Sequence, residues 1–399
     1  MEADIRTFLE LRLPTAEGLQ RTLAATEPDG VHPNRGWVYD AELGFVHTNA
    51  IHSSDGVNGA NTFYSYMADG ARRLVNFAHR PCRIHTYGDS FTHCDQVNDG
   101  ETWQEAISAH LQEPVRNYGV GGYSVYQAYR RMRKVCNEAA RVGDSSAEYI
   151  ILNIFDDDHY RNLVSWLRPL RGSSTLVRPH LRVNVGADTF VERENPIPSG
   201  RQLEKLRDLD FVYHEFAEDA LVYLAIAAES EGEKAAAFLA GACERLGLPA
   251  PTDRTAELEA AVNTVFTAAA LASTRHVVGL VEQFCAENGI ELMFVLSYRE
   301  GTIRSVLGGG ERFDQDFVAW LKTRAKPVVD MCEAFKNGFS QSTVDLDTFV
   351  KQYYIGHHTP FGNSYTAWTM MDEIVNLLSP KPVSYQSGIG IWQPSATCY

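Results

Sequence analysis

The feature that most constrains the fold is the nearly continuous apolar run Tyr149–Phe155. A strand that is apolar on both faces is typical of a parallel sheet covered by helices on both sides. Further apolar runs and amphipathic stretches alternate before and after it. The expected strands are Ile84–Tyr87, Pro114–Tyr118, Tyr149–Phe155, Glu291–Leu296 and Pro327–Asp330, and the expected helices are Thr102–Leu111, Ser124–Arg141, His276–Glu287, Phe313–Arg324 and Gly362–Leu378. This alternation predicts an α/β fold in three layers, with a parallel sheet between two layers of helices.

The alternation stops after residue 160 and returns at residue 274. Residues 166–210 are rich in proline, glycine and arginine and contain one candidate strand, Leu181–Val185, whereas residues 212–272 are rich in alanine and read as helical. We therefore expect a core made of residues 81–160 and 274–379, with a largely helical insertion or lid at 161–273. Residues 1–80 are expected to form an extension packed on the core, and residues 380–399 a C-terminal tail.

The charge of the chain restricts its partners. The formal net charge is −15, and both nucleic acids and anionic membranes attract basic surfaces. We expect neither as a partner. No stretch reads as long and apolar enough to span a bilayer, and the charged N-terminus does not resemble a signal peptide.

The cysteines are widely spaced, and no C-x-x-C pair occurs. This pattern disfavours a zinc ribbon and a disulfide scaffold, so we expect a cytoplasmic protein without a cofactor.

Three loops with reactive residues follow three of the expected strands. They are Gly88-Asp89-Ser90, Gly119-Val120-Gly121-Gly122 and Asp156-Asp157-Asp158-His159. Because ligands of parallel sheets bind outside the carboxyl ends of the strands, these loops should converge on one edge of the sheet. A serine on a tight turn there could act as a nucleophile if a base lies nearby.

The order of these motifs resembles that of the SGNH, or GDSL-type, hydrolase superfamily. The matching blocks are Gly88-Asp89-Ser90, Asn117–Gly122 and His357–Asn363. The resemblance covers residues 83–160 and 274–378 and implies a flavodoxin-like αβα fold. It further implies that Ser90 is the nucleophile, that His357 is the general base with His358 as the alternative, and that the Gly122 amide stabilises the oxyanion beside the Ser90 amide. No G-x-S-x-G motif of the α/β-hydrolases occurs.

The sequence departs from the family pattern at two positions. Asp157 falls where the family has an asparagine that donates to the oxyanion, and an ionised carboxylate can only accept hydrogen bonds. Tyr354 falls where the family has the aspartate that orients the histidine. Asp345, Asp347 or a backbone carbonyl could replace that aspartate.

These departures leave several functions open. The first is a serine esterase or deacylase that cleaves an ester, such as an O-acetyl group, of a carbohydrate, oligosaccharide or small metabolite. Clustered carboxylates at Asp89, Asp156, Asp157 and Asp158 also fit a glycosidase. The same cluster with His93, His159 and His357 could hold a divalent cation. A non-catalytic carbohydrate-binding protein is a further alternative, and in the plainest interpretation the aspartates cap a helix and pair with Arg161.

Overall fold

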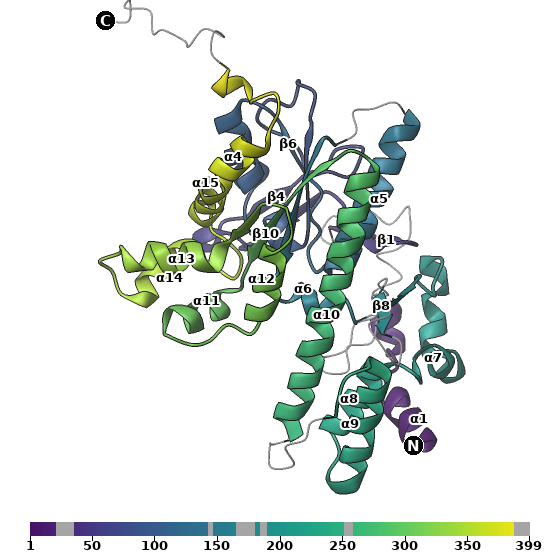
Figure 1. Cartoon of the computed structure of the whole chain (residues 1–399). Helices are drawn as coiled ribbons and strands as arrows, with labels where there is room; N and C mark the ends of the chain where they lie inside the picture. The colour runs from purple at the N-terminus through teal and green to yellow at the C-terminus, as the bar shows by residue number, and fades with distance from the viewer. Residues whose placement is uncertain (21–35, 143–146, 165–179, 184–189, 251–257, 387–399) are drawn as a thin grey trace, which may run out of the picture.

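Five parallel strands form the central sheet of the protein (Figure 1). The computed structural model describes residues 1–20, 36–142, 147–164, 180–183, 190–250 and 258–386. The strands are β5 (Ile84–Tyr87), β6 (Val115–Asn117), β7 (Tyr149–Phe155), β10 (Glu291–Ser297) and β11 (Val328–Asp330), in the spatial order β11-β10-β7-β5-β6. Each of the five expected strands is therefore present. Every residue of the central strand β7 is buried, as the unbroken apolar run predicts.

Helices cover both faces of this sheet (Figure 1). On one side α4 (Trp103–Leu111) packs against α15 (Pro360–Leu377), and on the other α5 (Val125–Val142) packs against α10 (Leu258–Glu287). The arrangement is a mixed α/β fold with a parallel sheet, in agreement with the expectation from the sequence. Its core contains the sheet residues together with the inner faces of these helices.

Three helices of the second half of the chain were not expected: α11 (Glu300–Leu307), α13 (Met331–Ser340) and α14 (Leu346–Tyr353). The expected helix at 313–324 is α12 (Gln315–Lys322). Asp330 and Asp345 start α13 and α14 by accepting backbone N–H bonds from the first turn. Helices of this length show too few periodic apolar positions to be read with assurance from sequence.

The insertion does not end at residue 273. The helix α10 runs unbroken from Leu258 to Glu287, so the expected boundary at 273/274 falls inside one helix. Its first half packs in a second hydrophobic cluster with α8 (Ala220–Ala228) and α9 (Gly232–Leu246), and its second half packs on the sheet. The insertion also holds a hairpin of β8 (His180–Val183) and β9 (Phe190–Arg193), a 3₁₀ segment at Gly200–Arg207, and α7 (Leu209–Phe216).

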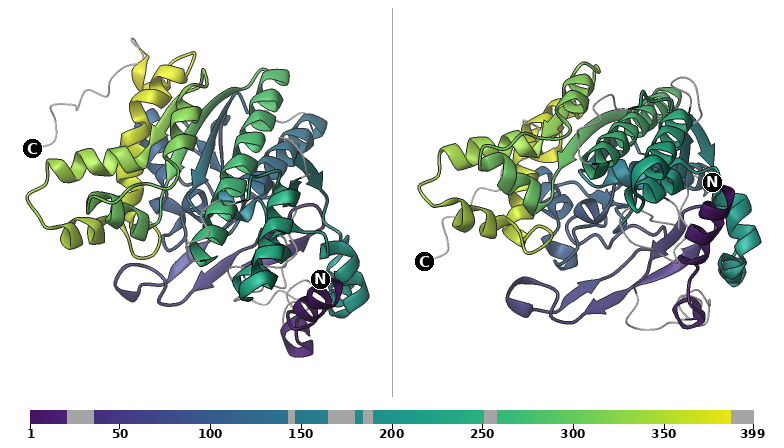
Figure 2. Two further views of the ribbon diagram at one scale, coloured as in Figure 1. Left: turned by 60° about the horizontal axis from the view of Figure 1, so that its bottom comes forward. Right: turned by 90° about the horizontal axis from the view of Figure 1, so that it is seen from below.

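The N-terminal extension packs in two places, which differs from the single packing on the core that we expected. The first helix, α1 (Glu2–Glu10), contacts α7 and α8 of the insertion (Figure 2). The following strands form two antiparallel pairs, β1 (Trp37–Asp40) with β2 (Gly44–His47) and β3 (Ala50–His52) with β4 (Thr62–Tyr64). The hairpin of β3 and β4 contacts Gln96, six residues after Ser90. The contacts come from Asp55 in its turn and from Tyr64 at the end of β4.

The structure bears on two expectations from the sequence, one on membrane-spanning segments and one on the cysteines. By length and composition alone α10 could cross a membrane, contrary to the expectation that no stretch could, although half of its most apolar window is buried within the structure. The six described cysteines are buried and free, while Cys398 and the rest of 387–399 lie outside the described residues.

Candidate active site

Ser90 is the first residue of the short helix α3 (Ser90–His93), directly after β5. The turn requires glycine at position 88, because its φ is +154° and a Cβ there would lie 2.7 Å from the carbonyl oxygen of Asn153. Asp89 caps α3 by accepting a bond of 2.9 Å from the Phe91 N–H. This strand–turn–helix geometry holds the Ser90 side chain at the carboxyl edge of the sheet, where only 6% of the residue is exposed.

The Ser90 hydroxyl is hydrogen-bonded to His357. Ser90 Oγ and His357 Nε2 lie 2.8 Å apart, although the two residues are separated by 267 positions in the chain. His357 stands in the loop between α14 and α15, and its ring packs 5.1 Å, between centroids, from that of Phe91. The structure thus brings together the expected nucleophile and the expected base.

His358, the alternative base, lies in a different environment. Its ring is buried against Phe91, Phe335 and Tyr354. Burial, with a further contribution from the nearby His357, lowers the pKa of His358 to about 3. A buried imidazole that stays neutral packs the loop below His357 but does not reach the serine, so His357 is the one that can act as base.

Among the residues that the structure describes, neither the expected side chains nor a backbone carbonyl is hydrogen-bonded to the His357 ring. Tyr354 points away and donates to the carbonyl oxygen of Tyr298 at 3.0 Å. Asp345 caps α14, and Asp347 pairs with Lys351 and Arg304. The suggestion that Asp345 or Asp347 replaces the family aspartate is therefore wrong.

Gln96 contacts the far side of the His357 ring instead. Its Oε1 lies 3.1 Å from His357 Nδ1 and 2.8 Å from the His357 backbone nitrogen. The backbone of Gln96 is left-handed, with φ of 71°, as is that of Cys94, with φ of 63°. These two turns direct the chain after α3 back toward the histidine loop.

Asp95 places a carboxylate beside the serine–histidine pair. Its Oδ2 lies 4.0 Å from His357 Nε2, and its Oδ1 is hydrogen-bonded to Nδ1 of the buried His93. Burial by itself would raise the pKa of the Asp95 carboxyl, but His93 and the neighbouring imidazoles lower that pKa well below its usual range. Asp95 is consequently ionised at neutral pH.

The glycine turn expected to bind the oxyanion packs directly on α3. A Cβ at Gly119 would lie 2.7 Å from the carbonyl carbon of Thr92, so only glycine allows this approach. Gly122 has φ of 80°, in the left-handed region. The Gly119 end of the turn therefore lies against α3, and the Val120 N–H donates to the carbonyl oxygen of Gly88 at 3.1 Å. The role expected of the Gly122 amide stays a prediction.

The acidic triplet after β7 is paired with two arginines. Arg161 contacts Asp157 at 3.0 Å and Asp158 at 2.8 Å, and it also contacts the buried Asp89 at 3.2 Å. Arg299 contacts Asp156 at 3.1 Å and Asp157 at 2.9 Å. This is the plain pairing with arginine considered above, and it makes Asp157 an acceptor for two guanidinium groups.

Burial raises the pKa values of Asp89 and Asp158. The two carboxyls are close enough to share the Nη1 group of Arg161, and Asp89 further raises the pKa of Asp158. The positive charge of Arg161 acts in the opposite direction on both. Arg161 thus offsets part of the negative charge of two buried acids, one of which, Asp89, directly precedes Ser90.

Of the histidines considered as metal ligands, His93 and His357 both lie beside Asp95, whereas His159 has other partners. His159 hydrogen-bonds Thr274 and packs on Phe317, and burial lowers its pKa to about 4. His93 donates to Asp95. Across the described parts of the chain, no group of three or more histidine, cysteine, aspartate or glutamate residues is arranged to hold a metal ion.

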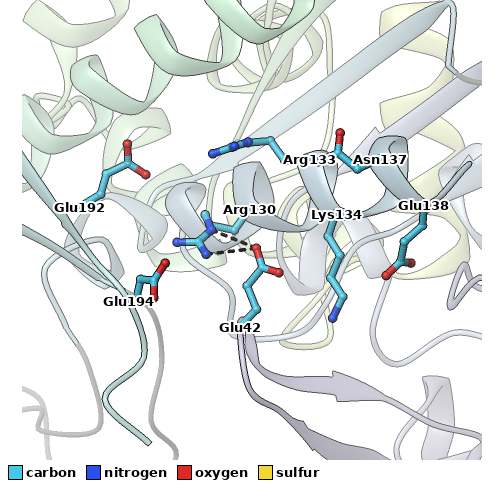
Figure 3. A pocket seen from close by; sticks show the side chains of 8 residues that line it. All are labelled: Glu42, Arg130, Arg133, Lys134, Asn137, Glu138, Glu192 and Glu194. Atoms are coloured by element: carbon cyan, nitrogen blue, oxygen red, sulfur yellow. Dashed lines mark hydrogen bonds and ion pairs between the residues drawn. The ribbon is translucent and has the colours of Figure 1, made fainter. Parts of the chain in front are cut away.

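Two of the pockets formed by the described residues are of interest here, and Ser90 lines neither of them. One, of about 410 Å³, is lined by charged residues of α5, β9 and the β1–β2 turn and includes none of the expected site residues (Figure 3). Another, of about 390 Å³, contains Asp156, Arg299 and Thr302 and borders the acidic triplet. A series of ion pairs runs from Arg299 in the second pocket through Asp157 and Arg161 to Asp89, whose carboxylate lies 3.2 Å from Ser90 Oγ.

The residues around the candidate site that sequence reasoning missed are Asp95, Gln96 and Arg299. Asp95 and Gln96 follow Ser90 by only five and six positions, so their proximity to the nucleophile was available from the sequence. Their direction was not, because it depends on the left-handed turns at Cys94 and Gln96.

The sequence matches no protein-family model, and no curated protein matches it.

Proposed function

We propose that the protein is an SGNH-like hydrolase that cleaves an ester through an acyl-serine intermediate on Ser90. The observation that carries this proposal is the 2.8 Å hydrogen bond between Ser90 Oγ and His357 Nε2 at the carboxyl edge of the sheet. The sheet order supports it, because the five strands taken in chain order are arranged 2-1-3-4-5, as in flavodoxin-like folds.

In the proposed reaction, His357 Nε2 accepts the Ser90 proton while Oγ attacks the ester carbonyl. The backbone N–H groups at Ser90 and in the Gly119–Gly122 turn stabilise the negative charge that develops on the carbonyl oxygen. His357 then returns the proton to the departing alcohol, and a water molecule, activated in the same way, hydrolyses the acyl-enzyme. The resemblance to the SGNH superfamily suggests an acylated carbohydrate or small metabolite as substrate.

The carboxylate-based glycosidase receives less support. Such an enzyme needs two carboxyl groups that flank the scissile bond, and Asp156, Asp157 and Asp158 are all engaged by arginine. We therefore expect Asp157→Asn to retain most of the ester cleavage.

The test is covalent labelling by a fluorophosphonate together with hydrolysis of p-nitrophenyl acetate. We expect the label on Ser90, and a loss of hydrolysis of about 10³-fold or more in Ser90→Ala and in His357→Ala. Ser305→Ala, an exposed serine of α11, is the matched control and should behave as the wild type. Labelling elsewhere, or unchanged hydrolysis in Ser90→Ala, would refute the proposal.

A further inference from the structure

We propose that Gln96 and Asp95 divide the task that a single carboxylate performs in a Ser-His-Asp triad. Gln96 fixes the tautomer and orientation of His357, and Asp95 supplies the negative charge that stabilises its protonated form. Both are positioning residues, and the inference rests on the proposed role of Ser90 and His357.

The orientation of the Gln96 amide follows from its neighbours. Gln96 Nε2 donates to the carbonyl oxygen of Asp55 at 3.1 Å, and the Gln96 backbone N–H donates to the Tyr64 hydroxyl at 2.7 Å. Oε1 is therefore the atom that faces His357. Since a carbonyl oxygen can only accept, His357 Nδ1 must carry the proton, which leaves Nε2 free to accept from Ser90.

The histidine loop has the shape that this contact requires. Gly356 has φ of +111°, and a Cβ at this position would lie 2.8 Å from Gln96 Oε1. The same oxygen accepts the His357 backbone N–H at 2.8 Å. The loop and the Gln96 side chain thus fit together only with glycine at position 356.

A neutral amide cannot stabilise an imidazolium as an ion does, and the nearby carboxylate of Asp95 can. Asp95 Oδ2 lies 4.0 Å from His357 Nε2, the atom that receives the Ser90 proton. The Asp95 side chain is only 25% exposed, so water screens its charge incompletely.

A chain of hydrogen bonds holds Asp95 in its ionised form. Tyr66 hydroxyl lies 3.0 Å from His47 Nδ1 and 2.6 Å from His93 Nε2, and His93 Nδ1 contacts Asp95 Oδ1. With His47 Nδ1 protonated, every member can donate toward Asp95, and bonds aligned in this way strengthen one another. Burial lowers the pKa values of both His47 and His93, which keeps them neutral.

The other titratable or charged groups that lie near His357 or Asp95 are Asp89 with Arg161, His358, His93 and His47. The Asp89 carboxylate, 3.2 Å from Ser90 Oγ, is paired with Arg161. His358 is neutral, and His93 and His47 stand behind Asp95. Among the described residues, Asp95 has no ion pair with lysine or arginine, so its charge acts mainly on the imidazoles around it.

The test measures fluorophosphonate labelling of Ser90 between pH 5 and pH 9 in the full-length protein. Gln96→Ala should slow labelling at least tenfold at every pH, because the ring loses its partner. Asp95→Asn should slow labelling and also shift its acidic limb to lower pH, because the carboxylate that favours protonation of the ring, 4.0 Å from His357 Nε2, is then neutral. Asp347→Asn removes a carboxylate near the loop that makes no contact with His357, and it should match the wild type.

The double variant Asp95→Asn/Gln96→Glu separates charge from folding. It moves the carboxylate to the Nδ1 side, so it should recover labelling relative to Asp95→Asn and return the acidic limb toward the wild-type pH. Histidine NMR titration of His357 in the same variants provides a readout that is independent of labelling.

The outcomes distinguish the two proposals. If the wild type is not labelled at Ser90, the proposed function fails. If Ser90 is labelled but the pH profiles and His357 titrations of Asp95→Asn and Gln96→Ala equal those of Asp347→Asn, the division of roles is refuted. Slower labelling in Asp95→Asn without any recovery in the double variant would also refute it, because the loss would then be structural.

Discussion

Arg161 is the residue on which the charge balance around the nucleophile depends. Its guanidinium contacts Asp89, Asp157 and Asp158, and both Asp89 and Asp158 are almost fully buried. Removing one partner from a buried ion pair is strongly destabilising because it leaves an uncompensated charge in the interior.

We therefore expect Arg161→Met, which keeps the length of the side chain, to lower the free energy of unfolding by about 3–5 kcal/mol. Adding Asp158→Asn should restore part of that loss, since one buried charge is then removed. Arg304→Met, at a more exposed pair with Glu300, should change stability by less than about 1 kcal/mol. Urea denaturation measures the free energy of unfolding of all three variants. If Arg161→Met lost no more stability than Arg304→Met, the buried ion pairs of Arg161 would not stabilise the fold as we expect.

Gly356 offers a second prediction at the scale of one residue. Gly356→Ala adds a methyl group 2.8 Å from Gln96 Oε1 in a backbone with positive φ, so the amide must move away from His357. We expect hydrolysis of p-nitrophenyl acetate to fall at least tenfold, with the fold retained by circular dichroism. Gly301→Ala, where no atom lies within 4 Å of the added Cβ, is the control and should keep full activity.

The expected site residues differ in how far the sequence determines them. Ser90 and His357 could be identified because each stands in a motif whose order along the chain implies a shared edge of the sheet. Gln96 could not, since its contact with His357 depends on positive φ at Cys94 and Gln96, conformations that neither residue type favours. Asp157 stands where the resemblance places the asparagine of the SGNH superfamily, but it contacts two arginines. One of them, Arg299, follows the strand β10, so this contact could not be predicted from the sequence around Asp157.

At the scale of elements, α10 joins the two hydrophobic clusters of the molecule. Val262 and Phe266, in its first half, pack in the cluster of the insertion. Val277 and Val281, in its second half, pack in the cluster of the sheet. Buried residues therefore occur along the whole helix and on more than one face, which explains why its continuity across residue 273 was not visible as a single amphipathic stripe.

Because α10 is one continuous helix, a proline in its middle should lower the free energy of unfolding more than a proline in its first turn. Ala272→Pro removes a backbone bond in the helix interior and should cost about 3 kcal/mol or more. Glu259→Pro lies in the first turn, where no intrahelical N–H bond is lost, and should cost far less. Thermal unfolding compares them, and equal costs would show that the helix is not continuous in solution.

Strands and connecting helices of the core were the most predictable elements. The apolar runs of β5 and β7 stop at Gly88 and Asp156, and Asn288-Gly289 shortly precedes β10. The ends of these three strands agree with the expected ends to within about one residue. The short helices α11, α13 and α14 were missed because they lack a long periodic pattern and are stabilised mainly by packing, with N-terminal aspartate caps on α13 and α14.

At the scale of the whole molecule, two buried histidines connect stability to pH. Burial lowers the pKa of His159 to about 4 and that of His358 to about 3, whereas both take up protons near pH 6.5 in the unfolded chain. Below pH 6.5 the unfolded state therefore binds more protons than the folded state, so stability falls as the pH decreases. The raised pKa values of Asp89 and Asp158 act with the opposite sign in part of the same range, so the wild-type slope alone does not isolate the histidines.

Comparison with variants does isolate them. We expect the free energy of unfolding of His159→Gln and of His358→Gln to depend less on pH than that of the wild type between pH 6.5 and 5, by about 1 kcal/mol per pH unit for each. Both substitutions also lower stability at pH 7 by disturbing buried packing, so the slope and not the absolute value is the measure. His79→Gln, at an exposed position, should leave the slope unchanged. Urea denaturation at four pH values decides the matter: parallel curves for wild type and variants would mean that these imidazoles take up protons in the folded protein as readily as in the unfolded chain.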